Sequence, residues 1–125
     1  MAVVVFAEGL DKKIKKSSLE AISCGAILAD KLGVECITVA LGEYDAIELQ
    51  ALGKSGAKKV IHVSSGVGVY PSAMVYANIL SACAKEQNAS VVLLSKSSLV
   101  DGIASRLSVE LNYNTFASFF NKLNN

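Results

Sequence analysis

The stretch that decides the fold of this chain is Val91-Val92-Leu93-Leu94-Ser95-Lys96-Ser97-Ser98, which continues into Leu99-Val100-Asp101-Gly102-Ile103-Ala104-Ser105-Arg106. Four branched apolar residues in a row predict a strand that is buried on both faces, as in a parallel sheet. Small polar and charged residues follow, and then a helical pattern begins. Open α/β sheets bind their ligands at such strand–turn–helix junctions, because helix N–H groups and the positive end of the helix dipole converge there.

The same alternation of strand and helix extends over the rest of the chain. Strands are predicted at residues 2–7, 35–41, 60–63 and 91–94, helices at 17–32, 44–53, 71–86 and 99–111, and a further strand at 116–120. Because crossovers between parallel strands are right-handed, this order predicts an α/β fold with a doubly wound, mostly parallel sheet and helices on both faces. The length of 125 residues fits a single domain, residues 1–125.

The segment between the first strand and the first helix is predicted to be a polar connection. It covers Gly9 to Lys16, with Leu10 and Ile14 turned inward. The helix that follows is predicted to begin with a capping box, in which Ser17 is the N-cap and Glu20 reaches back to the N–H of Ser17.

The composition is that of a globular protein, with 52% apolar and 18% charged residues and a formal net charge of +1. No basic face dominates, so no nucleic-acid partner is expected, and Lys12-Lys13-Ile14-Lys15-Lys16 is interpreted as a solvated loop. No apolar run reaches the length of a membrane span, and no signal or transit peptide precedes the first strand. We therefore expect a cytoplasmic protein without a membrane partner.

No catalytic or metal-binding group of residues is predicted. His62 is the single histidine and is interpreted as a partly buried structural residue, and the three cysteines have no C-x-x-C spacing. The G-x-S-x-G and Walker A motifs are absent, and Gly66-Val67-Gly68 follows the third strand, where it makes no dinucleotide fingerprint.

Ser95, Lys96, Ser97 and Ser98 remain as candidate cofactor-binding residues. Three hydroxyl groups and an ammonium group at a helix N-terminus would bind a phosphate. The alternative is that Ser97 or Ser98 is only the N-cap of the helix, with Lys96 in solvent.

Several segments resemble the N-terminal domain of the electron transfer flavoprotein alpha subunit. They are Val3-Val4-Val5-Phe6-Ala7-Glu8, Ser18-Leu19-Glu20-Ala21, the segment from Leu52 to Val60, and Ile103-Ala104-Ser105-Arg106-Leu107-Ser108-Val109. One departure falls on the junction, where members of this family usually carry Pro-Arg and this chain has Asp101-Gly102. The arginine of the family at that position therefore has no counterpart here.

The resemblance implies a three-layer α/β/α domain of the adenine nucleotide alpha hydrolase type, which packs with the beta subunit of a heterodimer. In this family FAD is held mainly by a separate C-terminal domain of the alpha subunit, and that domain is absent from these 125 residues. The chain is then the N-terminal part of a longer alpha subunit, with no FAD of its own. It would be a non-catalytic scaffold in an electron carrier that serves flavin dehydrogenases.

A second interpretation is a stand-alone adenine-nucleotide-binding domain that resembles universal stress proteins. It would use the switch-point crevice formed by Glu8 and residues 95–98. Universal stress proteins usually show a Gly-rich phosphate loop after the fourth strand, whereas Lys96-Ser97-Ser98 contains no glycine.

Overall fold

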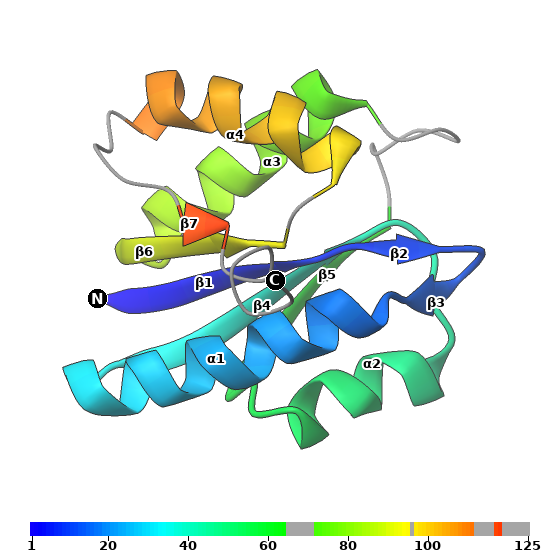
Figure 1. Cartoon of the computed structure of the whole chain (residues 1–125), viewed down its shortest axis with the longest axis vertical. Helices are drawn as coiled ribbons and strands as arrows, with labels where there is room; N and C mark the ends of the chain where they lie inside the picture. The colour runs from blue at the N-terminus through cyan, green and yellow to red at the C-terminus, as the bar shows by residue number, and fades with distance from the viewer. Residues whose placement is uncertain (65–71, 96, 112–116, 119–125) are drawn as a thin grey trace.

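The computed structural model describes residues 1–64, 72–95, 97–111 and 117–118. Its main sheet has five strands in the order β5-β4-β1-β6-β7, and every pairing in this sheet is parallel (Figure 1). The elements are β1 (Ala2–Ala7), β2 (Gly9–Leu10), β3 (Lys13–Ile14), α1 (Lys16–Leu32), β4 (Glu35–Leu41), α2 (Ala46–Lys54), β5 (Lys59–Val63), α3 (Ala73–Glu86), β6 (Ala89–Leu94), α4 (Ser98–Leu111) and β7 (Ala117–Ser118).

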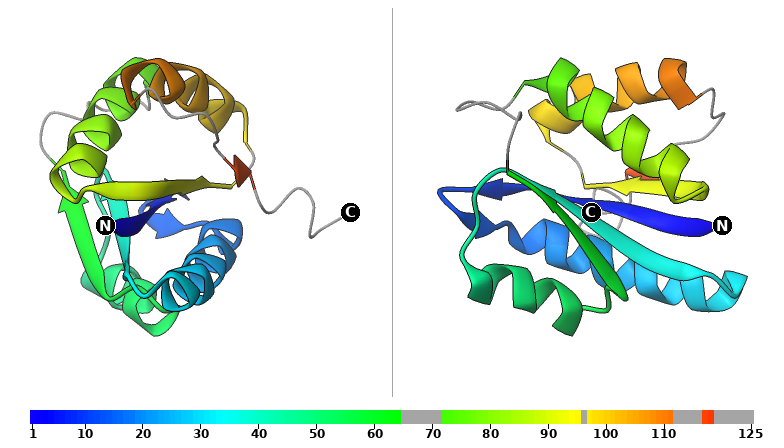
Figure 2. Two further views of the ribbon diagram at one scale, coloured as in Figure 1. Left: turned by 90° about the vertical axis from the view of Figure 1, so that its left-hand side faces the viewer. Right: turned by 180° about the vertical axis from the view of Figure 1, so that it is seen from behind.

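The sheet lies between two layers of helices. Helices α1 and α2 cover one face, and α3 and α4 cover the other, as two further views confirm (Figure 2). This is the three-layer α/β/α arrangement that the alternating sequence pattern predicts, so the predicted fold class is confirmed.

The core has two halves, one on each side of the central strand β1. All six residues of β1 are buried, and alternate side chains point to opposite faces. Val4 and Phe6 pack in the half under α3 and α4, while Val3 and Val5 pack in the half under α1. Since each buried valine contributes about 1.5–3 kcal/mol, a strand that is buried on both faces fixes the centre of the sheet.

The start of α1 differs from the prediction. The helix begins at Lys16, and its N-cap residue is Lys15, which makes no side-chain cap hydrogen bond. Ser17 is therefore not the N-cap, and the predicted capping box is wrong. The reason is that the amide groups of Ser18 and Leu19 already donate to the Lys15 carbonyl oxygen.

The predicted polar connection contains a small hairpin, in which β2 pairs with β3 in antiparallel fashion. Ile14 is buried as predicted, but Leu10 is 67% exposed. Leu10 pairs with Lys13, and Gly9 pairs with Ile14, so Leu10 lies on the face of the hairpin opposite the core.

The strand–turn–helix junction at residues 91–106 is formed as predicted in its main features. Strand β6 runs through Leu94, α4 begins at Ser98, and β7 adds to the outer edge of β6 through the pairs Leu93↔Ala117 and Leu94↔Ser118. The predicted last strand is thus confirmed for residues 117–118, and the rest of 116–120 lies outside the described residues.

Candidate functional site

Glu8 lies at the carboxyl end of β1, at the position where the strand order reverses direction between β1 and β6. It is only 6% exposed, although it is a charged residue that follows six apolar ones. Its backbone N–H donates to the Ser18 hydroxyl oxygen at 2.8 Å, which joins the end of β1 to the first turn of α1.

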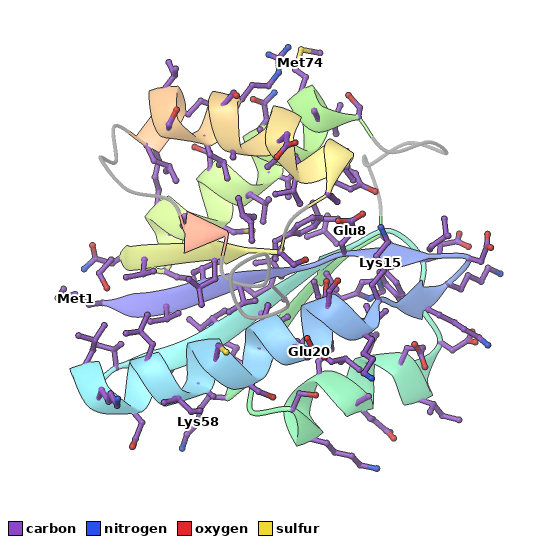
Figure 3. The ribbon with its side chains drawn as sticks, viewed as in Figure 1. Met1, Glu8, Lys15, Glu20, Lys58 and Met74 are labelled. Atoms are coloured by element: carbon purple, nitrogen blue, oxygen red, sulfur yellow. The ribbon has the colours of Figure 1, made fainter. Side chains whose placement is uncertain are left out.

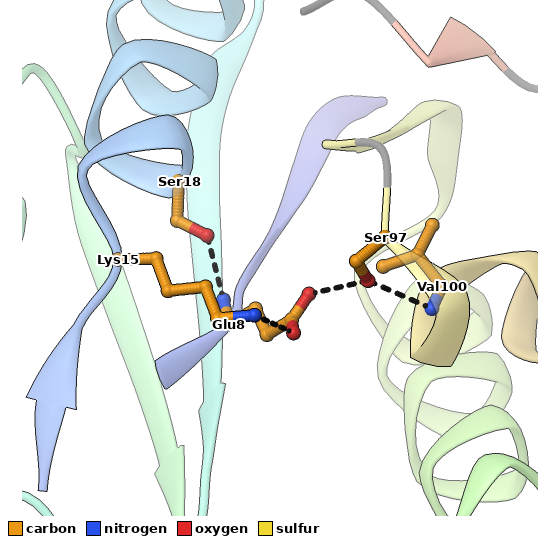
Figure 4. A network of polar contacts seen from close by, with 5 residues as sticks. All are labelled: Glu8, Lys15, Ser18, Ser97 and Val100. Carbon is orange, nitrogen blue, oxygen red and sulfur yellow. Dashed lines mark hydrogen bonds and ion pairs between the residues drawn. The ribbon is translucent and has the colours of Figure 1, made fainter. Parts of the chain in front are cut away.

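The carboxylate of Glu8 has a partner for each oxygen (Figure 4). Lys15 Nζ donates to Oε2 at 2.5 Å, and the Ser97 hydroxyl donates to Oε1 at 2.8 Å. The Lys15 and Glu8 side chains lie next to each other beside the end of β1 (Figure 3). A buried charge is tolerated where it is paired and hydrogen-bonded, and Glu8 meets both conditions.

Ser97 connects this carboxylate to α4. Its hydroxyl oxygen accepts from the backbone N–H of Val100 at 3.1 Å, and its carbonyl oxygen accepts from Asp101 N at 3.0 Å. Ser97 is therefore the N-cap of α4. The network formed by Glu8, Lys15, Ser18 and Ser97, here named the Glu8 network, links β1, α1 and α4.

The four predicted cofactor-binding residues, 95–98, do not share one environment in the structure. Ser95 follows β6 and is 1% exposed, Ser97 belongs to the Glu8 network, and Ser98 is the first residue of α4. Lys96 lies outside the described residues. The structure thus brings Ser97 to the switch point, and its observed partner there is Glu8.

Sequence reasoning missed Lys15, which was assigned to a solvated loop. Lys15 is half-buried and pairs with Glu8, so that interpretation is wrong for this residue. The available signal was Glu8 itself, because an acidic residue directly after a buried strand needs a cation nearby.

Two tyrosines lie close to the Glu8 network. Tyr76 is 8% exposed and packs edge-on against Phe6, with ring centroids 5.9 Å apart. Burial, followed by the nearby Glu8 charge, raises the pKa of Tyr76. Burial also raises the pKa of Tyr44 to about 12, with further contributions from Tyr76 and Glu8. Both phenols are therefore neutral donors at physiological pH.

Gly9 is required by the position of Tyr44. A Cβ atom at Gly9 would collide with the Tyr44 hydroxyl group and would lie 2.6 Å from the Lys13 carbonyl oxygen. The Tyr44 ring thus packs directly on the backbone of the hairpin, next to Glu8.

A pocket of about 280 Å³ lies farther along the same edge of the sheet, beyond the ends of β4 and β5. Its walls are Lys12, Glu43, Tyr44, Asp45, His62 and Ser64. His62 Nε2 donates to the Gly42 carbonyl oxygen at 2.6 Å. His62 is exposed rather than partly buried as predicted, because β5 lies at an edge of the sheet.

The pocket offers little chemistry. Lys12 and Glu43 are 3.9 Å apart and largely exposed, so their attraction is weak. Among the described residues, no three His, Cys, Asp or Glu side chains gather as metal ligands. No helix within the described part of the chain is long and apolar enough to cross a membrane.

Comparison with known proteins gives a family match over nearly the whole chain. Residues 3–118 match the model of the electron transfer flavoprotein domain. The electron transfer flavoprotein subunit alpha of Clostridium acetobutylicum is 28% identical over 110 residues, which make up 88% of this chain and 33% of that protein. The chain thus spans about a third of the length of this curated relative.

Solved structures with a similar fold include two of the universal stress protein from Archaeoglobus fulgidus, one of them in complex with dAMP. Both have a TM-score of 0.59, cover 93% of this chain and 94% or 95% of their own, and are 16% or 17% identical to it. At this level of identity the likeness shows the fold alone.

Proposed function

Since this chain belongs to the electron transfer flavoprotein domain family, we propose that it is the N-terminal scaffold and heterodimerisation domain of an electron transfer flavoprotein alpha subunit. The observation that supports this most is the 28% identity with an alpha subunit over 88% of the chain. The chain covers 33% of that relative, which agrees with the proposal that it corresponds to one domain of a longer subunit.

The physical character of the domain supports a scaffold role. Side chains from both faces of β1 enter well-packed halves of the core, and the buried charge at the end of β1 is already paired within the chain. The Ser97 hydroxyl, which lies beside the Glu8 carboxylate, is used to cap α4, and among the described residues no three His, Cys, Asp or Glu side chains gather as metal ligands. These features fit a domain that presents a surface to a partner subunit.

The proposal includes a cofactor and partners for the whole protein. FAD would be bound by the remainder of the alpha subunit, the beta subunit would be the heterodimer partner, and flavin dehydrogenases would supply the electrons. We propose that this carrier works in the bacterial cytoplasm.

The full reading frame provides the test. We expect the gene to continue into an FAD-binding domain and a beta subunit to be encoded beside it. Co-expression of the two full subunits should yield a complex with flavin absorbance, whereas residues 1–125 alone should purify without it. A reading frame that ends at Asn125 with no neighbouring beta-subunit gene would refute the proposal.

Calorimetric titration of the chain with ATP and AMP distinguishes the second interpretation. We expect no binding heat, because the proposed scaffold domain binds no nucleotide of its own. Micromolar binding would favour the stand-alone nucleotide-binding domain.

A further inference from the structure

The point between β1 and β6 is the position at which open α/β sheets generally bind their ligands. The strand order β5-β4-β1-β6-β7 reverses there, and α4 begins directly after β6. Helix N–H groups and the helix dipole favour a negative charge at such a position. The question is what satisfies that preference in this chain.

The Glu8 carboxylate occupies this position in the structure. It is 6% exposed, and it accepts from the hydroxyl group of Ser97 that caps α4 and from the ammonium group of Lys15. We propose that Glu8 is a built-in anion that fills the switch point and thereby excludes the phosphate group of any external ligand. The inference concerns contacts within this chain, so it stands independently of the proposed function.

Two physical reasons make Glu8 and an external phosphate mutually exclusive. Both would need the single O–H of Ser97, which already donates to Glu8, and both would compete for the positive charge of Lys15, which already pairs with Glu8. Among the described residues, Lys15 is the cation that pairs with Glu8, so a phosphate beside Glu8 would add a second negative charge next to one that is already balanced, and like charges repel strongly in a partly buried setting.

The position of Glu8 is fixed by its backbone as well as by its side chain. Its N–H donates to Ser18, a residue with 0% exposure in α1, so the residue is held where β1 ends. Contacts within the chain thus hold the carboxylate beside Ser97, which caps α4.

Chemical rescue tests this inference. Glu8→Ala removes the carboxylate and leaves Lys15 and Ser97 without it, so a small anion from solution should take its place. We would compare urea unfolding of the wild type and Glu8→Ala in sodium chloride, formate and phosphate at equal ionic strength. For Glu8→Ala, the free energy of unfolding should be higher in formate and in phosphate than in chloride, and the increase should saturate with anion concentration. For the wild type, the free energy of unfolding should be the same in all three salts.

Two further variants make the test specific. Glu43→Ala removes a carboxylate whose lysine partner, Lys12, is exposed, so it should respond to the three salts as the wild type does. The double variant Glu8→Ala/Ser97→Ala lacks the hydroxyl donor, and its apparent affinity for formate should fall by about tenfold, as expected for a lost hydrogen bond to a charged group.

The proposal fails if the wild type and Glu8→Ala respond equally to phosphate, or if the rescue persists undiminished in the double variant. If Glu8→Ala is unfolded in chloride, the readout becomes refolding in formate, followed by circular dichroism. Recovery of the native spectrum in formate but not in chloride would support the proposal, and no recovery in either anion would overturn it.

Discussion

Gly25 in α1 lies against side chains of the sheet without room for a Cβ atom, and its replacement by alanine has a predictable cost. A Cβ atom at this position would lie 2.7 Å from Val5 Cγ2, 3.3 Å from Leu93 Cδ1 and 3.4 Å from Cys36 Sγ. The three neighbours are at most 2% exposed, so none can move into solvent. Because the nearest atom belongs to a β-branched side chain with a stiff χ1 angle, the clash is not relieved by a simple rotation.

The expected magnitude follows from two opposing terms. Alanine is favoured over glycine inside a helix by about 1 kcal/mol, whereas overpacking of a core costs about 1–3 kcal/mol. We expect the upper part of that range at Gly25, and hence a net loss of about 1–2 kcal/mol in the free energy of unfolding. Urea denaturation followed by circular dichroism measures this loss.

Gly53 provides the matched control, because it lies in α2 and is exposed, and a Cβ atom at this position would meet nothing within 4 Å beyond its own stretch of helix. Gly53→Ala should stabilise the domain by about 0.5–1 kcal/mol through helix propensity alone. Because Val5→Ala removes the clashing methyl group, the double variant Gly25→Ala/Val5→Ala should lose about 1 kcal/mol less than the sum of the two single losses. The reasoning is refuted if Gly25→Ala stabilises the protein as much as Gly53→Ala.

Three further predictions concern buried polar and titratable groups. Thr38 has 0% exposure and its hydroxyl has no hydrogen-bond partner among the described residues, so Thr38→Val should raise the free energy of unfolding by about 1 kcal/mol in urea titrations; a loss of stability would contradict this. Because the pKa of Tyr44 is raised from 10.0 to about 12, its contribution to stability is complete below pH 10 and is lost as the pH rises toward 12. Tyr44→Phe should therefore lose less stability over that interval than the wild type, and parallel pH profiles would argue against the assigned cause. Cys36 is buried, and this burial raises the pKa of its thiol to about 11, so a disulfide reagent should label Cys36 only as fast as the domain unfolds globally. Fast labelling of Cys36 in the native protein would show that the site opens locally.

The order of elements could be predicted because it depends on local patterns. The apolar run of β1 and the branched residues before Ser95 specify buried strands, and Gly33 ends α1 with a φ of 70°, the left-handed conformation that glycine adopts readily. These signals need no knowledge of distant contacts.

The hairpin and the Glu8 network could not be predicted in the same way. The hairpin turn places Asp11 and Lys12 at φ values of 52° and 66°, and lysine is a poor indicator of such a turn. Glu8 and Ser97 are 89 residues apart in sequence, so their hydrogen bond becomes visible only when β1 and β6 are paired. The predicted start of α1 is wrong because the backbone of Lys15, and not the side chain of Ser17, accepts from the amide groups of the first turn.

The proposed function is tested most directly by association of this chain with the beta subunit encoded beside its gene. Sedimentation equilibrium of the purified chain, the purified beta subunit and their mixture gives the masses in solution without any assumption about cofactors. We predict a complex of one chain with one beta subunit that forms without added FAD. If the two proteins sediment independently at concentrations well above the dissociation constants of stable heterodimers, this domain does not form the heterodimer and the assignment is contradicted.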